Sequence, residues 1–461
     1  MNQMPIGRGA QQAAFPPGHT GGPVPGGTQG GMPGVPAHPG APDHTGSQLR
    51  LRPAPDADGS QLLTTDEVGP LLSAAVGHAG GSLVQWALDH VDATPNQSTT
   101  ATYSAVVDWP FGRREELLGA SVRVGGINAS DERAEIFADG DRAAAVWLYP
   151  RDPDLPGLVR AAYPAEMAQI LSEVMRTHVP ADRVRLDMIG YRPRRRAVLR
   201  ATVGLQSPHG PQYTRFYTKV LRESNFADIK LRHELLLNAG VPAPHIASAT
   251  NDFLLVLDEL PGVPLSKAIF DPAPPCTAEQ LIWVLDSMPK QVADLPRRPP
   301  WSDAVGHYSE MVVQAMPSLE PRLRWLSGEI IAGLRDIPPG DEATHGDFHE
   351  GQIHVGGGQI CGILDVDTAG PGRRADDLAC LVAHLSTVQR MNAEQAARVR
   401  HLLSTWVPVF DERVDPTELR LRAAAVVISL ATGPYRSQER NWEAETVGII
   451  DAAETLVCQV V

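Results

Sequence analysis

Lysine, cysteine and long apolar runs are scarce in this 461-residue chain, and each scarcity limits what the protein can be. Its four cysteines form no Cys-x-x-Cys or His pair at metal spacing, which excludes a disulfide framework and fits a reducing cytoplasm. No apolar run has the length of a membrane span, and the N-terminus lacks the pattern of a signal peptide. A net charge of −14 argues against a general nucleic-acid binder. We therefore expect a cytoplasmic protein that binds neither a membrane nor nucleic acid.

The first fifty residues contain twelve Gly, nine Pro and no Lys. A segment of this composition buries too little apolar surface to offset its chain entropy. The sequence therefore predicts a disordered tail over residues 1–60.

Two carboxylates stand 18 residues apart in the C-terminal half of the chain. Asp347 lies in the stretch His-Gly-Asp-Phe-His-Glu-Gly-Gln that begins at His345, and Asp365 follows Ile-Leu. Short apolar segments at 353–355 and 360–364, separated by three glycines, predict a β-hairpin that brings both side chains to one end. Phosphoryl transfer from a nucleotide needs such a pair, one carboxylate near the acceptor hydroxyl and one on Mg²⁺.

The upstream half supplies a cation and an acid in the order that this chemistry needs. Lys219 lies in the middle of an aromatic and β-branched strand, in a chain with only four Lys beside thirty-six Arg. Glu234 follows fifteen residues later in a predicted helix and is the candidate partner for Lys219. An apolar run at 253–257 then predicts a buried strand that leads into the turn Pro261-Gly262.

The order and spacing of these motifs resemble the aminoglycoside phosphotransferase family, relatives of the protein kinases. The resemblance implies that Asp347 is the catalytic residue, that His345 positions its loop and that Asp365 binds Mg²⁺. Gln352 occupies the position where the family usually has Asn, so it is a candidate second metal ligand. Asp377, in the segment Asp-Leu-Ala, would tie the catalytic loop to the helix behind it.

The resemblance also implies a nucleotide site, at which Lys219 and Glu234 form an ion pair. Backbone groups of Glu259 and Leu260 would hydrogen-bond the base of ATP or GTP. No Gly-rich loop precedes this region; the arginine-rich turn 192–196 stands in its place. Its arginines either contact phosphates directly or form a solvated turn.

These features predict an α+β, two-lobed protein-kinase-like fold with a β-rich small lobe and a helical large lobe. We expect an accessory N-terminal cap at 61–180, the small lobe and hinge at 181–262, and the large lobe with its catalytic and metal loops at 263–461. Two predicted hairpins, at 102–124 and 134–149, make the cap β-rich.

The expected activity is ATP- or GTP-dependent and Mg²⁺-dependent phosphorylation of a hydroxyl on a small molecule, an aminoglycoside-like antibiotic or a sugar. Maltokinase-like activity or phosphorylation of a peptide hydroxyl would use the same residues. A non-catalytic pseudokinase scaffold is the alternative from a different class; Gln352 and the missing Gly-rich loop favour it, whereas Lys219, Asp347 and Asp365 oppose it.

Overall fold

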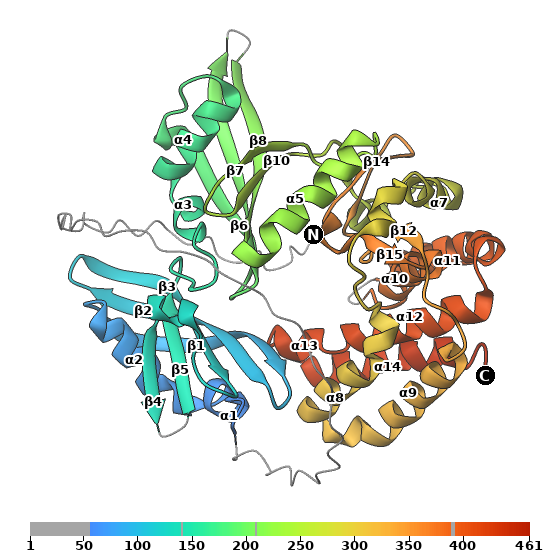
Figure 1. Cartoon of the computed structure of the whole chain (residues 1–461), viewed down its shortest axis with the longest axis horizontal. Helices are drawn as coiled ribbons and strands as arrows, with labels where there is room; N and C mark the ends of the chain where they lie inside the picture. Colours follow the sequence, from blue (N-terminus) through green and yellow to red (C-terminus); the bar gives the residue numbers. More distant parts are fainter. Residues whose placement is uncertain (1–55, 140–141, 208–209, 389–391) are drawn as a thin grey trace, which may run out of the picture.

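The computed structural model describes residues 56–139, 142–207, 210–388 and 392–461. Figure 1 shows three parts, an N-terminal cap, a second sheet flanked by helices, and a large helical lobe at the C-terminal end. The disordered tail predicted at 1–60 lies almost entirely outside the described residues.

The cap is a five-stranded antiparallel sheet covered by helices α1 (Ser60–Thr64) and α2 (Gly69–His78). Its strand order is β1-β2-β3-β5-β4, with bounds Ser82–Thr94, Ser98–Trp109, Gly112–Arg123, Arg142–Leu148 and Glu135–Asp139 respectively. Both predicted hairpins are present, since β2 pairs with β3 and β4 with β5. The long strand β1 was not predicted.

The small lobe is a second five-stranded antiparallel sheet, in the order β6-β7-β8-β10-β9. Its strands are Val184–Arg192, Arg196–Ser207, Gly210–Leu221, Leu254–Asp258 and Ile246–Ala249 respectively. Alternate residues of β10 face opposite sides of the sheet, as the period of a strand requires. Leu254 and Val256 pack with helices α3 (Leu158–Ala162) and α4 (Pro164–Met175), whereas Leu255 and Leu257 pack with α5 (Glu223–Asn238).

The core of this small lobe begins ahead of the boundary that the sequence suggested. Leu155, Leu158 and Leu171 share one buried cluster with residues of β7 and β10. The cap boundary at residue 180 is therefore misplaced, because the apolar faces of α3 and α4 are covered by the second sheet.

The large lobe is mostly helical and contains the largest buried cluster, in which α10 and α12 are central. Its helices are α6 (Leu265–Ala268), α7 (Ala278–Asp286), α8 (Val305–Ala315), α9 (Glu320–Leu334), α10 (Arg374–Ser386), α11 (Ala393–Arg413), α12 (Pro416–Leu430), α13 (Gly433–Arg436) and α14 (Trp442–Val457). The strands β11 (Val263–Pro264), β13 (Ile353–Gly356) and β14 (Gln359–Ile363) form one sheet, and β12 (Glu342–Thr344) pairs with β15 (Gly370–Gly372). The hairpin predicted after Asp347 is thus β13–β14.

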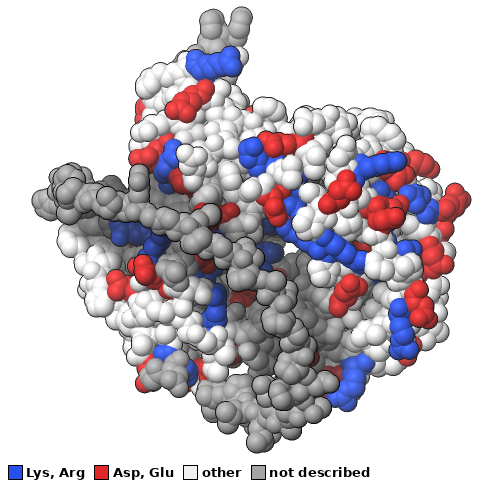
Figure 2. All heavy atoms as spheres, in the orientation of Figure 1, with Lys and Arg blue, Asp and Glu red and all other residues white. Residues whose placement is uncertain are grey.

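Short 3-10 helices join these elements at Asp66–Val68, Ala129–Arg133, Ala181–Arg183, Lys290–Asp294, Trp301–Ala304, Pro317–Leu319 and Val366–Thr368. Within the described residues, no helix is both long and apolar enough to cross a membrane. Acidic and basic side chains are interspersed over the face of the large lobe in Figure 2, so the excess negative charge forms no single acidic face in this view. The two-lobed α+β arrangement expected from the sequence is confirmed.

Candidate active site

The loop after β12 carries His345 and Asp347. His345 is fully buried, and its Nε2 lies 2.8 Å from the backbone oxygen of Leu364, next to Asp365. The backbone N–H of Asp347 donates to His345 Nδ1 over 3.3 Å. Because Nδ1 accepts this bond, Nε2 is the nitrogen that donates to Leu364. His345 therefore joins the loop of Asp347 to the loop of Asp365.

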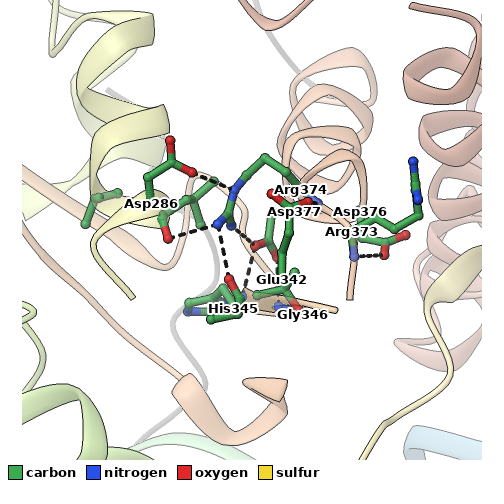
Figure 3. Close-up of polar contacts among 12 residues, drawn as sticks. Asp286, Glu342, His345, Gly346, Arg373, Arg374, Asp376 and Asp377 are labelled. Carbon is green, nitrogen blue, oxygen red and sulfur yellow. Dashed lines mark hydrogen bonds and ion pairs between the residues drawn. The ribbon is translucent and has the colours of Figure 1, made fainter. Parts of the chain in front are cut away.

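Asp377 on α10 fixes the backbone of the same loop. Its carboxylate accepts the N–H groups of His345 and Gly346 over 2.9 and 2.8 Å, and the guanidinium of Arg374 donates to it over 3.1 Å (Figure 3). Burial raises the pKa of Asp377, and Arg374 opposes the rise. Gly346 has a φ of 80°, and a Cβ there would lie 2.7 Å from the backbone oxygen of Thr368. Only glycine fits this position without displacing the loop of Thr368.

Lys219 on β8 contacts two carboxylates of the loop after β14. Its Nζ lies 2.7 Å from Asp365 Oδ1 and 2.6 Å from Asp367 Oδ1, and the lysine is only 6% exposed. Arg196, at the start of β7, donates to both oxygens of Asp365 at 2.9 Å. Burial alone would raise the pKa of Asp365, but Lys219 and Arg196 hold it well below its usual range. The structure thus brings two cations of the small lobe, Lys219 and Arg196, and two carboxylates of the loop after β14 into one ion-pair cluster.

The expected ion pair between Lys219 and Glu234 is not formed. Glu234 contacts Lys230 instead, one helical turn away at 2.5 Å, with a side chain 45% exposed. The preceding residue, His233, is 1% exposed and lies close enough to Lys219 and Asp367 for both to affect its pKa. Burial, and then the nearby Lys219, lower the pKa of His233 to about 4. Successive residues on a helix point about 100° apart, so turning His233 inward turns Glu234 outward.

Asp367 was not among the site residues expected from the sequence. It is 6% exposed and contacts both Lys219 and Arg196. The signal was the Asp-Val-Asp spacing, because two carboxylates two residues apart in a tight turn can face one cation. Asp365 itself has a φ of 52°, an uncommon conformation for a residue other than glycine, and such strain is typical of functional loops.

The oxygen donors around Asp365 fit a hard divalent cation. Asp365 and Asp367 supply carboxylates, the ligands that Mg²⁺ prefers, and both face the junction of the two lobes. Their contacts with Lys219 and Arg196 show that the cluster already tolerates positive charge. The side-chain nitrogen of Gln352 is placed 3.2 Å from His349 Nε2, so this amide contacts an imidazole rather than Asp365. Its role as a metal ligand stays a prediction.

Two histidines and a glutamate stand beside Asp347. The rings of His349 and His384 stack with centroids 4.1 Å apart and an interplanar angle of 9°, and Glu350 Oε2 lies 3.6 Å from Nδ1 of each. Burial, and then His349, lower the pKa of His384 to about 4. Asp347, His349 and His384 offer ligand atoms within 4.8 Å of one another. However, the nitrogen lone pairs of parallel stacked rings lie in parallel planes and do not converge on one ion.

Glu259 and Leu260 directly follow β10, which ends at Asp258. The side chain of Glu259 contacts Arg215 at 3.4 Å, and Leu260 packs close to Gly362, where a Cβ would lie 2.8 Å from its Cδ1. Both contacts involve side chains, so the binding of a nucleotide base by the backbone groups of Glu259 and Leu260 stays a prediction.

The arginine-rich turn is docked against the cap, which neither earlier interpretation anticipated. Arg194 is 5% exposed and forms ion pairs with Asp131 of the cap and, at 3.3 Å, with Asp154. Arg195 contacts Asp92 of β1 at 3.2 Å. Arg196, by contrast, contacts Asp365 and Asp367. The cap thereby holds the arginine-rich turn through Arg194 and Arg195.

Comparison with known proteins finds a family match for the catalytic half. Residues 228–412 match the model of the phosphotransferase enzyme family. This range includes the loops of Asp347 and Asp365 and begins after Lys219. A search of curated proteins found no match.

Solved structures that resemble the chain are kinases of small molecules. An ethanolamine kinase of Plasmodium vivax is 13% identical, with 61% of this chain and 85% of that one covered and a TM-score of 0.41. The choline kinase LicA from Streptococcus pneumoniae is 12% identical, with 64% of this chain and 99% of that one covered and a TM-score of 0.41. A thermostable mutant of aminoglycoside phosphotransferase APH(4)-Ia, in a ternary complex with AMP-PNP and hygromycin B, is 13% identical. The match covers 63% of this chain and 97% of that one, with a TM-score of 0.44. Because these TM-scores lie below 0.5, nothing about the chemistry is inferred from them. The family match agrees with the resemblance seen in the sequence: residues 228–412 match the model of the phosphotransferase enzyme family.

Proposed function

We propose that this protein is a phosphotransferase that uses a nucleoside triphosphate and Mg²⁺ to phosphorylate a hydroxyl of a small molecule. The observation that carries the proposal is the meeting of Lys219, Asp365 and Asp367 at the junction of the lobes, joined through His345 to the loop of Asp347. A buried cation beside two carboxylates, with a third carboxylate on a rigid neighbouring loop, is the set that phosphoryl transfer requires.

Asp347 is the proposed catalytic residue. It would accept a hydrogen bond from the acceptor hydroxyl and take its proton as the new O–P bond forms. The loop around it is already rigid, because Asp377 holds two of its backbone N–H groups and His345 a third. Positioning of the hydroxyl therefore costs no ordering of this loop at the moment of reaction.

Lys219 and Asp365 are the proposed nucleotide and metal residues. Mg²⁺, when bound with the nucleotide, would neutralise charge on the phosphates, with Asp365 and Asp367 as its carboxylate ligands. Lys219 would then contact the α- and β-phosphates, so its present contact with Asp365 would be exchanged for one with the nucleotide. Glu259 and Leu260 would bind the base, either adenine or guanine.

The acceptor would lie against Asp347 and the wall formed by His349, His384 and Glu350. Polar, partly buried groups of this kind suit a polyhydroxylated molecule, so we favour a sugar or an aminoglycoside over a peptide. Cys276, Cys361, Cys380 and Cys458 are free, which is compatible with the cytoplasmic location that we propose.

A transfer assay with matched variants tests the proposal. The wild type is incubated with Mg²⁺ and ATP or GTP against aminoglycosides, maltose, glucosamine and related metabolites, and acceptor mass is measured. We expect one class of acceptor to gain a phosphate with wild type and with Asp341→Asn, an exposed aspartate six residues upstream, but not with Asp347→Asn. If no acceptor gains a phosphate but Mg²⁺ and nucleotide still raise the melting temperature, the non-catalytic scaffold is favoured. If neither transfer nor a thermal shift is seen, nucleotide binding is refuted as well.

A further inference from the structure

A partly open cavity of about 280 Å³ lies between the cap and the large lobe. The cap contributes α1, β1 and β2 to its lining, and the large lobe contributes α8 and the region from α12 to α14. Figure 1 shows β1 of the cap facing α13 of the large lobe. None of the residues proposed for catalysis or metal binding lines this cavity. Its volume is close to the lower end of small-molecule sites, about 300 Å³.

The lining suits a ligand with many hydroxyls and no positive charge. Side-chain hydroxyls come from Ser60, Thr64, Thr65, Thr432 and Thr446, and amides from Gln61 and Gln314. The rings of Tyr435 and Trp442 meet edge to face, with centroids 5.1 Å apart, and both reach the cavity. Such rings offer an apolar face for carbon–hydrogen groups beside a polar edge. None of the described lining residues is acidic, and Arg436 is the one charged residue among them.

Arg436 belongs to a group of cations that share one carboxylate. Asp92 on β1 lies 3.2 Å from Arg195 Nε and 3.6 Å from a terminal nitrogen of Arg436. The same two arginines act on the phenol of Tyr308 on α8. Burial raises the pKa of Tyr308, whereas the positive charges of Arg436 and Arg195 oppose the rise. Two guanidinium groups against one carboxylate leave positive charge at the edge of the cavity, which favours an anion there.

Three buried polar atoms at this junction have no hydrogen-bond partner among the described residues. They are Thr99 Oγ1 and Arg436 Nε, both in lining residues, and His90 Nε2, two residues before Asp92 on β1. A buried polar group without a partner costs about 1–3 kcal/mol. Natural proteins rarely leave several such groups together unless a water, ion or ligand completes them.

We propose that this cavity binds a small polyhydroxylated anion, a phosphorylated sugar or polyol of about hexose size. The hydroxylated body would occupy the space beside Tyr435 and Trp442, and the anionic group would lie at Arg436. The site is separate from the phosphotransfer site and does not depend on that activity. Ligand bound there touches the cap and the large lobe together, and Asp92 connects it to the turn that carries Arg196.

Isothermal titration calorimetry with the full chain tests this site. The probes are glucose 6-phosphate, glucose and inorganic phosphate, each titrated with saturating AMP-PNP and Mg²⁺ so that the nucleotide site is filled. We expect glucose 6-phosphate to bind at least tenfold more tightly than either half-probe. Arg436→Ala should weaken it at least tenfold, whereas Arg324→Ala, an exposed arginine on α9 of the same lobe, should not.

A second variant distinguishes the contribution of the cavity's shape to binding from that of the Arg436 charge. Ala315→Phe places a ring at the lining without altering any ion pair, and it should weaken glucose 6-phosphate but leave the nucleotide thermal shift unchanged. Equal affinity for phosphate and glucose 6-phosphate would overturn the polyol site. Failure of all three probes to bind at millimolar concentration, or binding that neither Arg436→Ala nor Ala315→Phe weakens, would overturn the proposal as a whole.

Discussion

Asp367, rather than Glu234, should be the acid on which the position of Lys219 depends. The contact from Lys219 to Asp367 is 2.6 Å long and buried, whereas Glu234 is 45% exposed and paired with Lys230. Loss of a hydrogen bond to a charged group costs about 1.5–3 kcal/mol. At about 1.4 kcal/mol for each factor of ten, Asp367→Asn should lower kcat/KM roughly 10- to 150-fold. The exposed pair of Glu234 is worth about 0.3–0.5 kcal/mol, so Glu234→Gln should change activity by a factor of about two.

The assay is steady-state ADP release with the acceptor identified by the transfer screen. The affinity of a fluorescent nucleotide in the presence of Mg²⁺ is the second readout, because it does not depend on the acceptor. Circular dichroism and the melting temperature establish that both variants fold. Near-normal activity of Asp367→Asn beside a large loss in Glu234→Gln would refute the reasoning. It would mean that α5 rotates on nucleotide binding and brings Glu234 to Lys219.

Three further substitutions test the contacts that hold the site. Asp377→Asn leaves Arg374 without its buried charge partner and should destabilise the fold by about 3–5 kcal/mol, measured by urea unfolding. Arg194→Ala should release the cap, seen as faster proteolytic cleavage between cap and small lobe; unchanged cleavage would contradict the docking seen here. Burial lowers the pKa of His233 from its ordinary 6.5 to about 4 in the folded protein, so the unfolded chain binds more protons between these pH values and acid destabilises the fold. The wild type should therefore lose about 2 kcal/mol of unfolding free energy between pH 7 and pH 5 through His233, and His233→Phe should lack this loss.

The sequence predicted the hairpin and the adjoining loops of the C-terminal half well because their motifs are local. Asp347, His345, Asp365 and Asp377 lie within 33 residues, counted from His345 to Asp377, and short turns fix where their side chains point. The hairpin β13–β14 follows from three glycines between two apolar segments. Register within such a compact unit leaves few alternatives.

The partner of Lys219 was not predictable in the same way. Whether His233 or Glu234 is turned toward the sheet depends on the rotation of α5 about its axis. The sequence does not fix this rotation, because both faces of the helix contain apolar residues. A rotation of one residue exchanges the buried and exposed positions, and only packing against the sheet decides it. The docking of the arginine-rich turn was equally hidden, because Asp92 and Asp131 lie in the cap, far away in sequence, and β1 itself was not predicted.

The family match begins at residue 228, whereas Lys219 and Arg196 precede it. The matched range therefore leaves out the strand pair β7–β8, whose Arg196 and Lys219 contact the carboxylates of Asp365 and Asp367. Ion pairs of Arg194 and Arg195 with aspartates of the cap fix the turn that leads into β7. A fragment cut to the matched range would leave the two buried carboxylates without their cations, so the stability of that range depends on both other parts of the chain.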